Sequence, residues 1–166
     1  MIKRLWAFLL DYLLILAYAL VIYCLTQIVR HVFRIEMTAL SPVIGQLIGF
    51  TTLTLPVFFY FYLSERSTYR GTLGKRRMGI AVGNQHTHKA GNVLLRNVLK
   101  FLPWEVAHMG VHWVVFYGSA GNNTPVWVWI LLVFPQITAL LYVASIFRYG
   151  DSSLYDGPAG TRIVLR

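Results

Sequence analysis

The chain has 166 residues, of which 57% are hydrophobic and 13% are charged, and its formal net charge is +9. The apolar residues stand in long blocks, which is typical of an integral membrane protein and leaves no room for a separate soluble domain. In a soluble chain this positive charge would suggest nucleic-acid binding. Here the lysines and arginines flank the apolar blocks, so membrane orientation and contact with anionic lipids explain them better, and no nucleic-acid partner is expected.

Residues 5–29 form the first predicted membrane span, which is long enough to cross a bilayer as a helix. Arg4 stands at its start, and Asp11 lies roughly 10 Å deeper at the usual helical rise. A carboxylate at this depth costs at least ~2.5 kcal/mol, so Asp11 should face protein or water, be paired, or carry a proton. Positions 4, 11 and 18 share one helix face, which predicts a polar stripe of Arg4, Asp11 and Tyr18. The stripe fits either a structural pair that fixes helix packing or a site for a proton or cation.

The second predicted span covers residues 42–63, and a polar cytoplasmic loop follows at residues 65–100. Gly45 and Gly49 are spaced so that another helix can approach closely. The helical pattern over residues 92–102 favours a basic amphipathic helix on the membrane surface, and the alternative is the polar start of the next span. Four basic residues of this loop are expected to contact lipid head groups: Arg76, Arg77, Arg96 and Lys100.

Two further spans are predicted over residues 103–117 and 126–147, followed by a polar tail at residues 148–166. Of the 15 lysines and arginines, 13 fall on one side of a four-span arrangement in which both termini are cytoplasmic. This distribution follows the positive-inside rule. The predicted fold is therefore an all-α membrane protein, a bundle of four transmembrane helices forming a single domain over residues 1–166.

Three segments carry a resemblance to a known family. They read GTLGKRRMGIAV at residues 71–82, LRN at residues 95–97 and LYDGPAGTRIV at residues 154–164. In this order, and with Arg4 and Asp11 in the first helix, they resemble the RDD family of bacterial membrane proteins, which is named for one arginine and two aspartates. The resemblance covers nearly the whole chain and makes Asp156 the second aspartate.

The resemblance implies a multi-span protein of the bacterial cytoplasmic membrane. The family has been proposed to take part in transport, and some members are associated with sodium–proton antiport. The glycine-rich motifs suit a cytoplasmic cap in which residues 78–82 and 162–165 pair as two short strands. Asp156 would then lie near the cytoplasmic mouth, with Arg4 or Arg96 as its partner.

A second polar group stands in the third predicted span, where Glu105, His108 and His112 share one helix face. The two histidines have the spacing that lets both imidazoles bind one metal, so a site for zinc or a similar divalent ion is geometrically allowed. A proton relay is a second interpretation, because histidine titrates near neutral pH. Hydrogen bonds to other helices are a third. The three residues span ~10 Å along the axis, which favours a polar path over one compact site.

The first functional hypothesis is a small transporter that exchanges a cation for protons, with Asp11 as the titrating site and the second polar group extending its path. Four short helices cannot easily enclose such a site, so a homo-oligomer is expected. The alternative is a non-catalytic assembly or interaction factor that binds anionic lipid or a partner membrane protein. We find no nucleophile–base arrangement and no phosphate-binding glycine loop in the sequence, so an enzyme is not expected.

Overall fold

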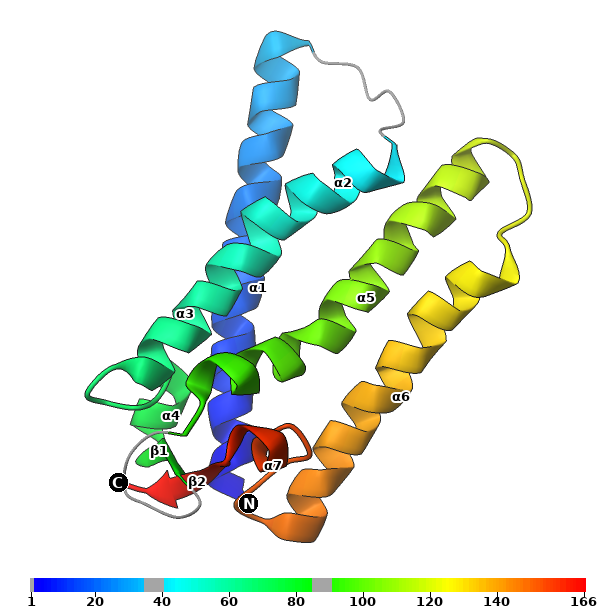
Figure 1. The fold of residues 1–166 in the computed structure, drawn as a ribbon. Helices are drawn as coiled ribbons and strands as arrows, with labels where there is room; N and C mark the ends of the chain where they lie inside the picture. Colours follow the sequence, from blue (N-terminus) through cyan, green and yellow to red (C-terminus); the bar gives the residue numbers. More distant parts are fainter. Residues whose placement is uncertain (1, 35–40, 85–90) are drawn as a thin grey trace.

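The computed structural model describes residues 2–34, 41–84 and 91–166. Its elements in chain order are α1 (Ile2–Phe33), α2 (Pro42–Gly49), the π-helical turn η1 (Phe50–Thr54), α3 (Leu55–Arg66), α4 (Leu73–Arg77), β1 (Ile80–Asn84), α5 (Val93–Ser119), α6 (Val126–Tyr149), α7 (Asp156–Ala159) and β2 (Thr161–Leu165). The four short elements α4, β1, α7 and β2 gather at one end of the long helices, where both chain termini also lie (Figure 1). We call these four elements the cap.

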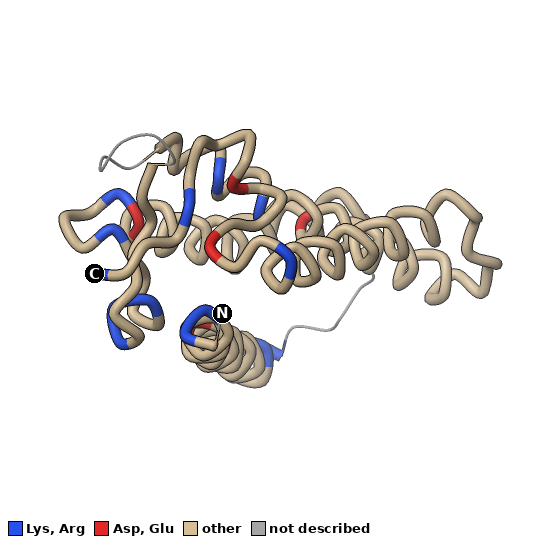
Figure 2. Tube along the Cα trace, turned by 90° about the horizontal axis from the view of Figure 1, so that it is seen from below, with Lys and Arg blue, Asp and Glu red and all other residues tan. Residues whose placement is uncertain are grey.

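Within the described residues, three helical stretches are long and apolar enough to cross a membrane: Ile2–Phe33, Pro42–Arg66 and Val126–Tyr149. They contain the first, second and fourth spans expected from the sequence and extend each of them by a few residues. The third expected span, residues 103–117, lies inside α5, which has 27 residues. Helix α5 is not one of the three apolar stretches, and its polar side chains lower its mean hydropathy. Lys, Arg, Asp and Glu gather around the cap, while most of the length of α5 and α6 carries none (Figure 2).

The second stretch changes from α2 to α3 through a π-helical turn just before Pro56. Proline lacks a backbone N–H and crowds the carbonyl four residues earlier, which here belongs to Thr52. The turn relieves this crowding, because the Leu55 N–H bonds to the Phe50 carbonyl, five residues back. The Thr52 carbonyl accepts the Tyr18 hydroxyl instead, at 2.7 Å. Tyr18 of the predicted polar stripe thus links α1 to the middle of the second stretch.

Helix α5 contains Pro103 and solves the same problem with a second tyrosine. Pro103 cannot donate to the carbonyl of Leu99, and the Tyr142 hydroxyl of α6 donates to it at 3.1 Å. The helix therefore continues through the proline, and α5 packs along α6.

The surface helix expected at residues 92–102 is wrong, because this segment is the first part of α5. Asn92 caps the helix by accepting the Leu95 N–H at 2.9 Å. The polar side chains of Arg96 and Asn97 are buried rather than spread on a membrane surface. They turn inward because buried carboxylates under the bundle offer them partners, which a hydropathy pattern does not reveal.

The strand pair expected from the family motifs is confirmed. Strands β1 and β2 are antiparallel, with Val82 opposite Ile163, and each lies within two residues of the expected range. Their inward side chains form an apolar core with Ala7 of α1. Residues 85–90 of the predicted central loop lie outside the described residues.

Helix α1 reaches the cap through a close backbone approach between Ala7 and Gly74 of α4. A β-carbon on Gly74 would overlap the Ala7 carbonyl, so only glycine allows this contact. The approach seats α1 on the cap, and α4 is the element against which α1 packs most extensively.

We therefore expect Gly74→Ala to destabilise the protein by about 1–3 kcal/mol, the usual range for overpacking. The thermal midpoint of the purified protein in detergent should fall. Loss of the monodisperse gel-filtration peak with rising temperature measures this midpoint. Gly118→Ala is the matched control, because a β-carbon at Gly118 would meet no atom within 4 Å. Equal midpoints for the two variants would contradict the close approach.

Candidate functional site

Glu65 at the end of α3 is fully buried and accepts bonds from three side chains. The Lys75 ammonium of α4 forms an ion pair with one of its carboxylate oxygens. The other oxygen accepts Arg96 Nε at 3.1 Å and Asn97 Nδ2 at 3.0 Å, both from α5. The acid thus joins three helices beneath the membrane spans.

Asp156, at the start of α7, is the second fully buried acid. It forms an ion pair with the Arg96 guanidinium and accepts the Thr161 hydroxyl at 2.6 Å and the Ser153 N–H at 2.8 Å. Arg4 Nη2 lies 3.8 Å from its other oxygen. Of the two partners considered for Arg4, Asp11 and Asp156, the structure places Asp156 beside it.

Asp11 is buried in α1 and serves as an acceptor for α3 and α4. Its carboxylate receives the Gly74 N–H at 2.9 Å, the Tyr60 hydroxyl at 3.1 Å and the Thr72 hydroxyl. Thr72 is also the N-cap of α4. The cost of burying the Asp11 side chain in a membrane helix is therefore offset by three specific hydrogen bonds.

Glu105, His108 and His112 lie along the contact between α5 and α2. Glu105 accepts a hydrogen bond from Gln46, and the two imidazole rings lie 4.8 Å apart between centroids. Beta-carbons on Gly49 and Gly45 would overlap His108 and His112, respectively, so the two glycines leave room for the two rings. This is the close approach predicted from the glycine spacing, although histidines rather than a backbone fill it.

The three-ligand metal site allowed by the spacing is not formed. Within residues 2–34, 41–84 and 91–166, no three His, Cys, Asp or Glu side chains come together closely enough to hold a metal ion. The three residues rise along the helix, and each meets α2 at a different level. Four buried polar atoms of this cluster have no hydrogen-bond partner in the described structure: Gln46 Oε1, Glu105 Oε2, His108 Nδ1 and His112 Nε2.

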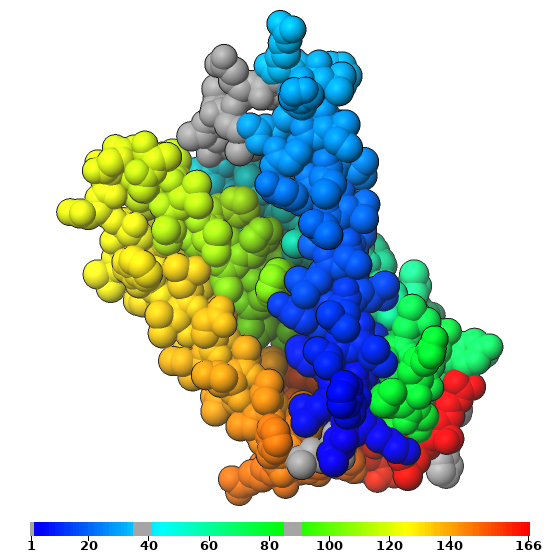
Figure 3. Space-filling view, turned by 180° about the vertical axis from the view of Figure 1, so that it is seen from behind, coloured from blue at the N-terminus to red at the C-terminus, as the bar shows by residue number. Residues whose placement is uncertain are grey.

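A cavity of about 550 Å³ lies between α1 on one side and α5 and α6 on the other. In Figure 3, α1 stands forward of the α5 and α6 pair on this face of the molecule. The charged residues and histidine at the cavity wall are Arg4, Asp11, Lys75, Arg96, Lys100 and His108, and Tyr142 and Tyr155 also line it. Both polar groups predicted from the sequence therefore reach one cavity, Asp11 from α1 and His108 from α5.

The four residues expected to bind lipid head groups differ in exposure. Arg77 is exposed, and Arg76 is half-buried, donates to the Gly71 carbonyl at 2.8 Å and lies over the Tyr69 ring. Arg96 is only 1% exposed and is paired with two acids, which corrects its expected position at the membrane surface. Lys100 faces the cavity.

Sequence reasoning missed Glu65 and Lys75 as members of the buried network. A signal was present, because Glu65 is the single acid in the strongly basic segment 65–100. An isolated acid among cations beside a membrane span is expected to be paired.

A protein-family model described as the RDD family matches residues 1–160 of this chain. The chain matches no curated protein and no solved structure significantly. Because the match covers nearly the whole chain, the protein belongs to the RDD family of bacterial membrane proteins. Of the three residues that the resemblance assigns to the family's name, Arg4, Asp11 and Asp156, the structure places Arg4 beside Asp156.

Replacing Glu65 with glutamine should lower the free energy of unfolding by about 3–5 kcal/mol, because Lys75 and Arg96 would lose a buried counter-charge. Thermal unfolding in detergent would measure the change. Asp151→Asn removes an acid near the same end of the molecule, but from an exposed position, and should leave the midpoint nearly unchanged. A similar small shift for both variants would show that the Glu65 pairs do not hold the cap together.

Proposed function

We propose that this RDD family protein is a small proton-coupled membrane transporter whose substrate site is the cavity between α1, α5 and α6. The observation that carries the proposal is that Asp11 and His108, from two different helices, both line this cavity. Ionisable residues within membrane helices are costly and are commonly retained for ion or proton pathways.

The cluster of Glu105, His108 and His112 is the proposed proton entry. Each buried polar atom without a partner costs about 1–3 kcal/mol, and this cluster contains four of them in one place. Water molecules or a proton would satisfy these atoms. Histidine also changes charge near neutral pH, which suits a relay leading to the cavity through His108.

Sodium–proton exchange is the version that the sequence favours, and the site gives it less support than proton coupling in general. Asp11 already holds three donors, which sodium would have to displace. The cavity wall also carries four cations against this one acid, and they would repel a metal cation. We therefore assign the coupled solute as an anion.

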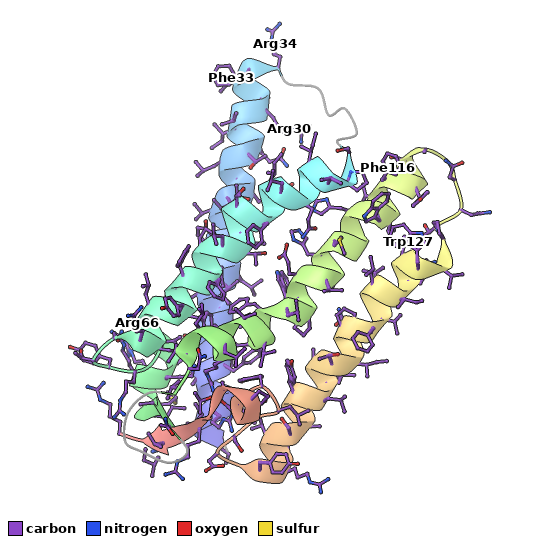
Figure 4. The ribbon with its side chains drawn as sticks, in the orientation of Figure 1. Arg30, Phe33, Arg34, Arg66, Phe116 and Trp127 are labelled. Atoms are coloured by element: carbon purple, nitrogen blue, oxygen red, sulfur yellow. The ribbon has the colours of Figure 1, made fainter. Side chains whose placement is uncertain are left out.

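The proposed topology has four spans, with α5 as the third and both termini in the cytoplasm of a bacterial cell. Arg30 and Arg34 lie at the end of α1 far from the cap, whereas Arg66 lies beside the cap (Figure 4). The cap end has the greater positive charge, so the positive-inside rule directs it to the cytoplasm. Only 6% of the most apolar window of α1 is buried. The exposed face of this helix leaves room for lipid or for a second copy in a homo-oligomer.

The alternative function is a non-catalytic assembly factor that binds anionic lipid or a partner membrane protein. It is favoured by the complete pairing of Asp11, Glu65 and Asp156, which suits charges that specify how the helices pack.

Reconstitution into sealed liposomes with an internal pH dye tests the two functions. Wild-type protein should move protons when an anion gradient is imposed, and Asp11→Asn should reduce the rate to background, because an amide cannot exchange a proton. Asp151→Asn is the matched control and should keep the rate. A folded wild type that moves no protons with sodium, potassium or any anion would contradict transport and favour the assembly factor.

His108→Gln should lower the same proton rate by about tenfold or more, in line with the contribution of a positioned proton-transfer group. His31→Gln is the control, because His31 is an exposed histidine at the opposite end of α1. Equal rates for wild type and His108→Gln would remove the second polar group from the path.

A further inference from the structure

We propose that the cavity binds the anionic head group of a membrane amphiphile, a lipid with a phosphate or carboxylate group, and that its acyl chain leaves between α1 and α6. The inference rests on the proposed function, since it names the substrate class of the same site. Three features of the cavity support it: its charge balance, the position of its acids, and its walls.

Basic side chains outnumber acidic ones among the buried groups described at the cap end. Arg4, Lys75, Arg96 and Lys100 supply four cations, and the acids that accompany them are Asp11, Glu65 and Asp156. Of these four basic side chains, Lys100 is the one for which the described part of the chain places no carboxylate within 4 Å. The ammonium lies 3.3 Å from the centre of the Phe61 ring. An anion in the cavity would give this amine a partner and favour its ammonium form.

The acids of the network stand behind the cations as seen from the cavity. Glu65 and Asp156 are fully buried and do not line the wall, whereas all four cations do. Asp11 is the only carboxylate among the described residues that line this cavity. A head group entering the cavity would therefore meet guanidinium and ammonium groups, which bind phosphate and carboxylate strongly.

The remaining wall is mostly apolar, with His108 and Gln136 among its few polar side chains, and extends away from the charged floor. Ile80 and Ile163 of the cap close the floor, and Trp104 and Val111 continue the wall along α5. From Lys100 to Val111 the wall runs about 16 Å at the helical rise, a length that suits an acyl chain and exceeds the needs of an inorganic ion.

The proposed exit for the acyl chain lies between α1 and α6, which make little contact with each other. Helix α1 packs chiefly on α4, and α5 packs on α6, so few backbone contacts join α1 to the α5 and α6 pair. Figure 2 shows α1 end-on, apart from the layer that contains α5 and α6. A ligand with one charged end and one apolar end fits a cavity that has a cationic floor, apolar walls and a lateral opening.

Trp104 makes this inference testable, because its side chain lines the cavity. The full-length protein would be placed in vesicles that contain either a brominated anionic phospholipid or its brominated zwitterionic counterpart, at matched mole fractions. Bromine quenches nearby tryptophan fluorescence, and the difference between wild type and Trp104→Phe isolates the signal of Trp104. Quenching of Trp104 should be stronger with the anionic lipid.

Lys100→Gln should weaken this head-group preference by about tenfold, as expected for the loss of one charge-assisted contact. Lys100→Arg should keep the preference, which guards against a variant that merely folds poorly. The matched control is Arg66→Gln, which removes one exposed cation from the same end of the molecule and should also keep it.

Equal loss in Arg66→Gln would overturn the inference, because general surface attraction would then explain the preference. Relief of quenching by inorganic phosphate would overturn it in favour of a soluble anion, and equal quenching by the two lipids would overturn it in favour of an uncharged occupant or a second copy of the chain. A head-group preference without proton flux would support this inference and contradict transport. Proton flux without a head-group preference would support transport and contradict this inference.

Discussion

The position of Arg96 between two buried carboxylates is the constraint on which the architecture depends. Its guanidinium reaches Glu65 from α3 and Asp156 from α7, so three helices far apart in the sequence meet at one side chain. Arg4 approaches Asp156 from α1. Buried ion pairs of this kind add little net stability compared with apolar packing, but they are costly to break. The network therefore acts mainly to select one arrangement of the helices at the cap end.

The cap also explains why a cavity exists above it. Helix α1 is fastened at its start by the Asp11 hydrogen bonds and by the close approach to Gly74, and again at Tyr18, where the Pro56 region leaves a carbonyl free. In the described residues, α1 has no comparable attachment to α5 or α6. Helix α1 is attached at the cap and makes little contact with α5 and α6 elsewhere. A cavity therefore remains between them, and the basic side chains at the cap end lie on its floor.

The cluster on α2 and α5 differs from the cap network in one physical respect. The carboxylates of the cap have well-placed donors, whereas Gln46, Glu105, His108 and His112 each retain a buried polar atom without a partner. Fully paired groups resist change, and incompletely paired groups can accept water or protons. This contrast separates the fully paired network at the cap from the incompletely paired cluster between α2 and α5, although Asp11 and His108 face the same cavity.

Local patterns in the sequence were enough to locate the apolar spans, the paired strands and the two polar groups, because hydropathy, glycine spacing and helical periodicity are properties of neighbouring residues. The role of residues 92–102 was wrong for the same reason: a basic helical face looks alike whether lipid or protein covers it. Only the tertiary structure decided that Arg4 meets Asp156 rather than Asp11, that Glu65 and Lys75 join Arg96, and that one cavity collects Asp11 and His108. Those pairings depend on how side chains from distant elements meet in space, and a low-dielectric interior rewards whichever opposite charges come within reach.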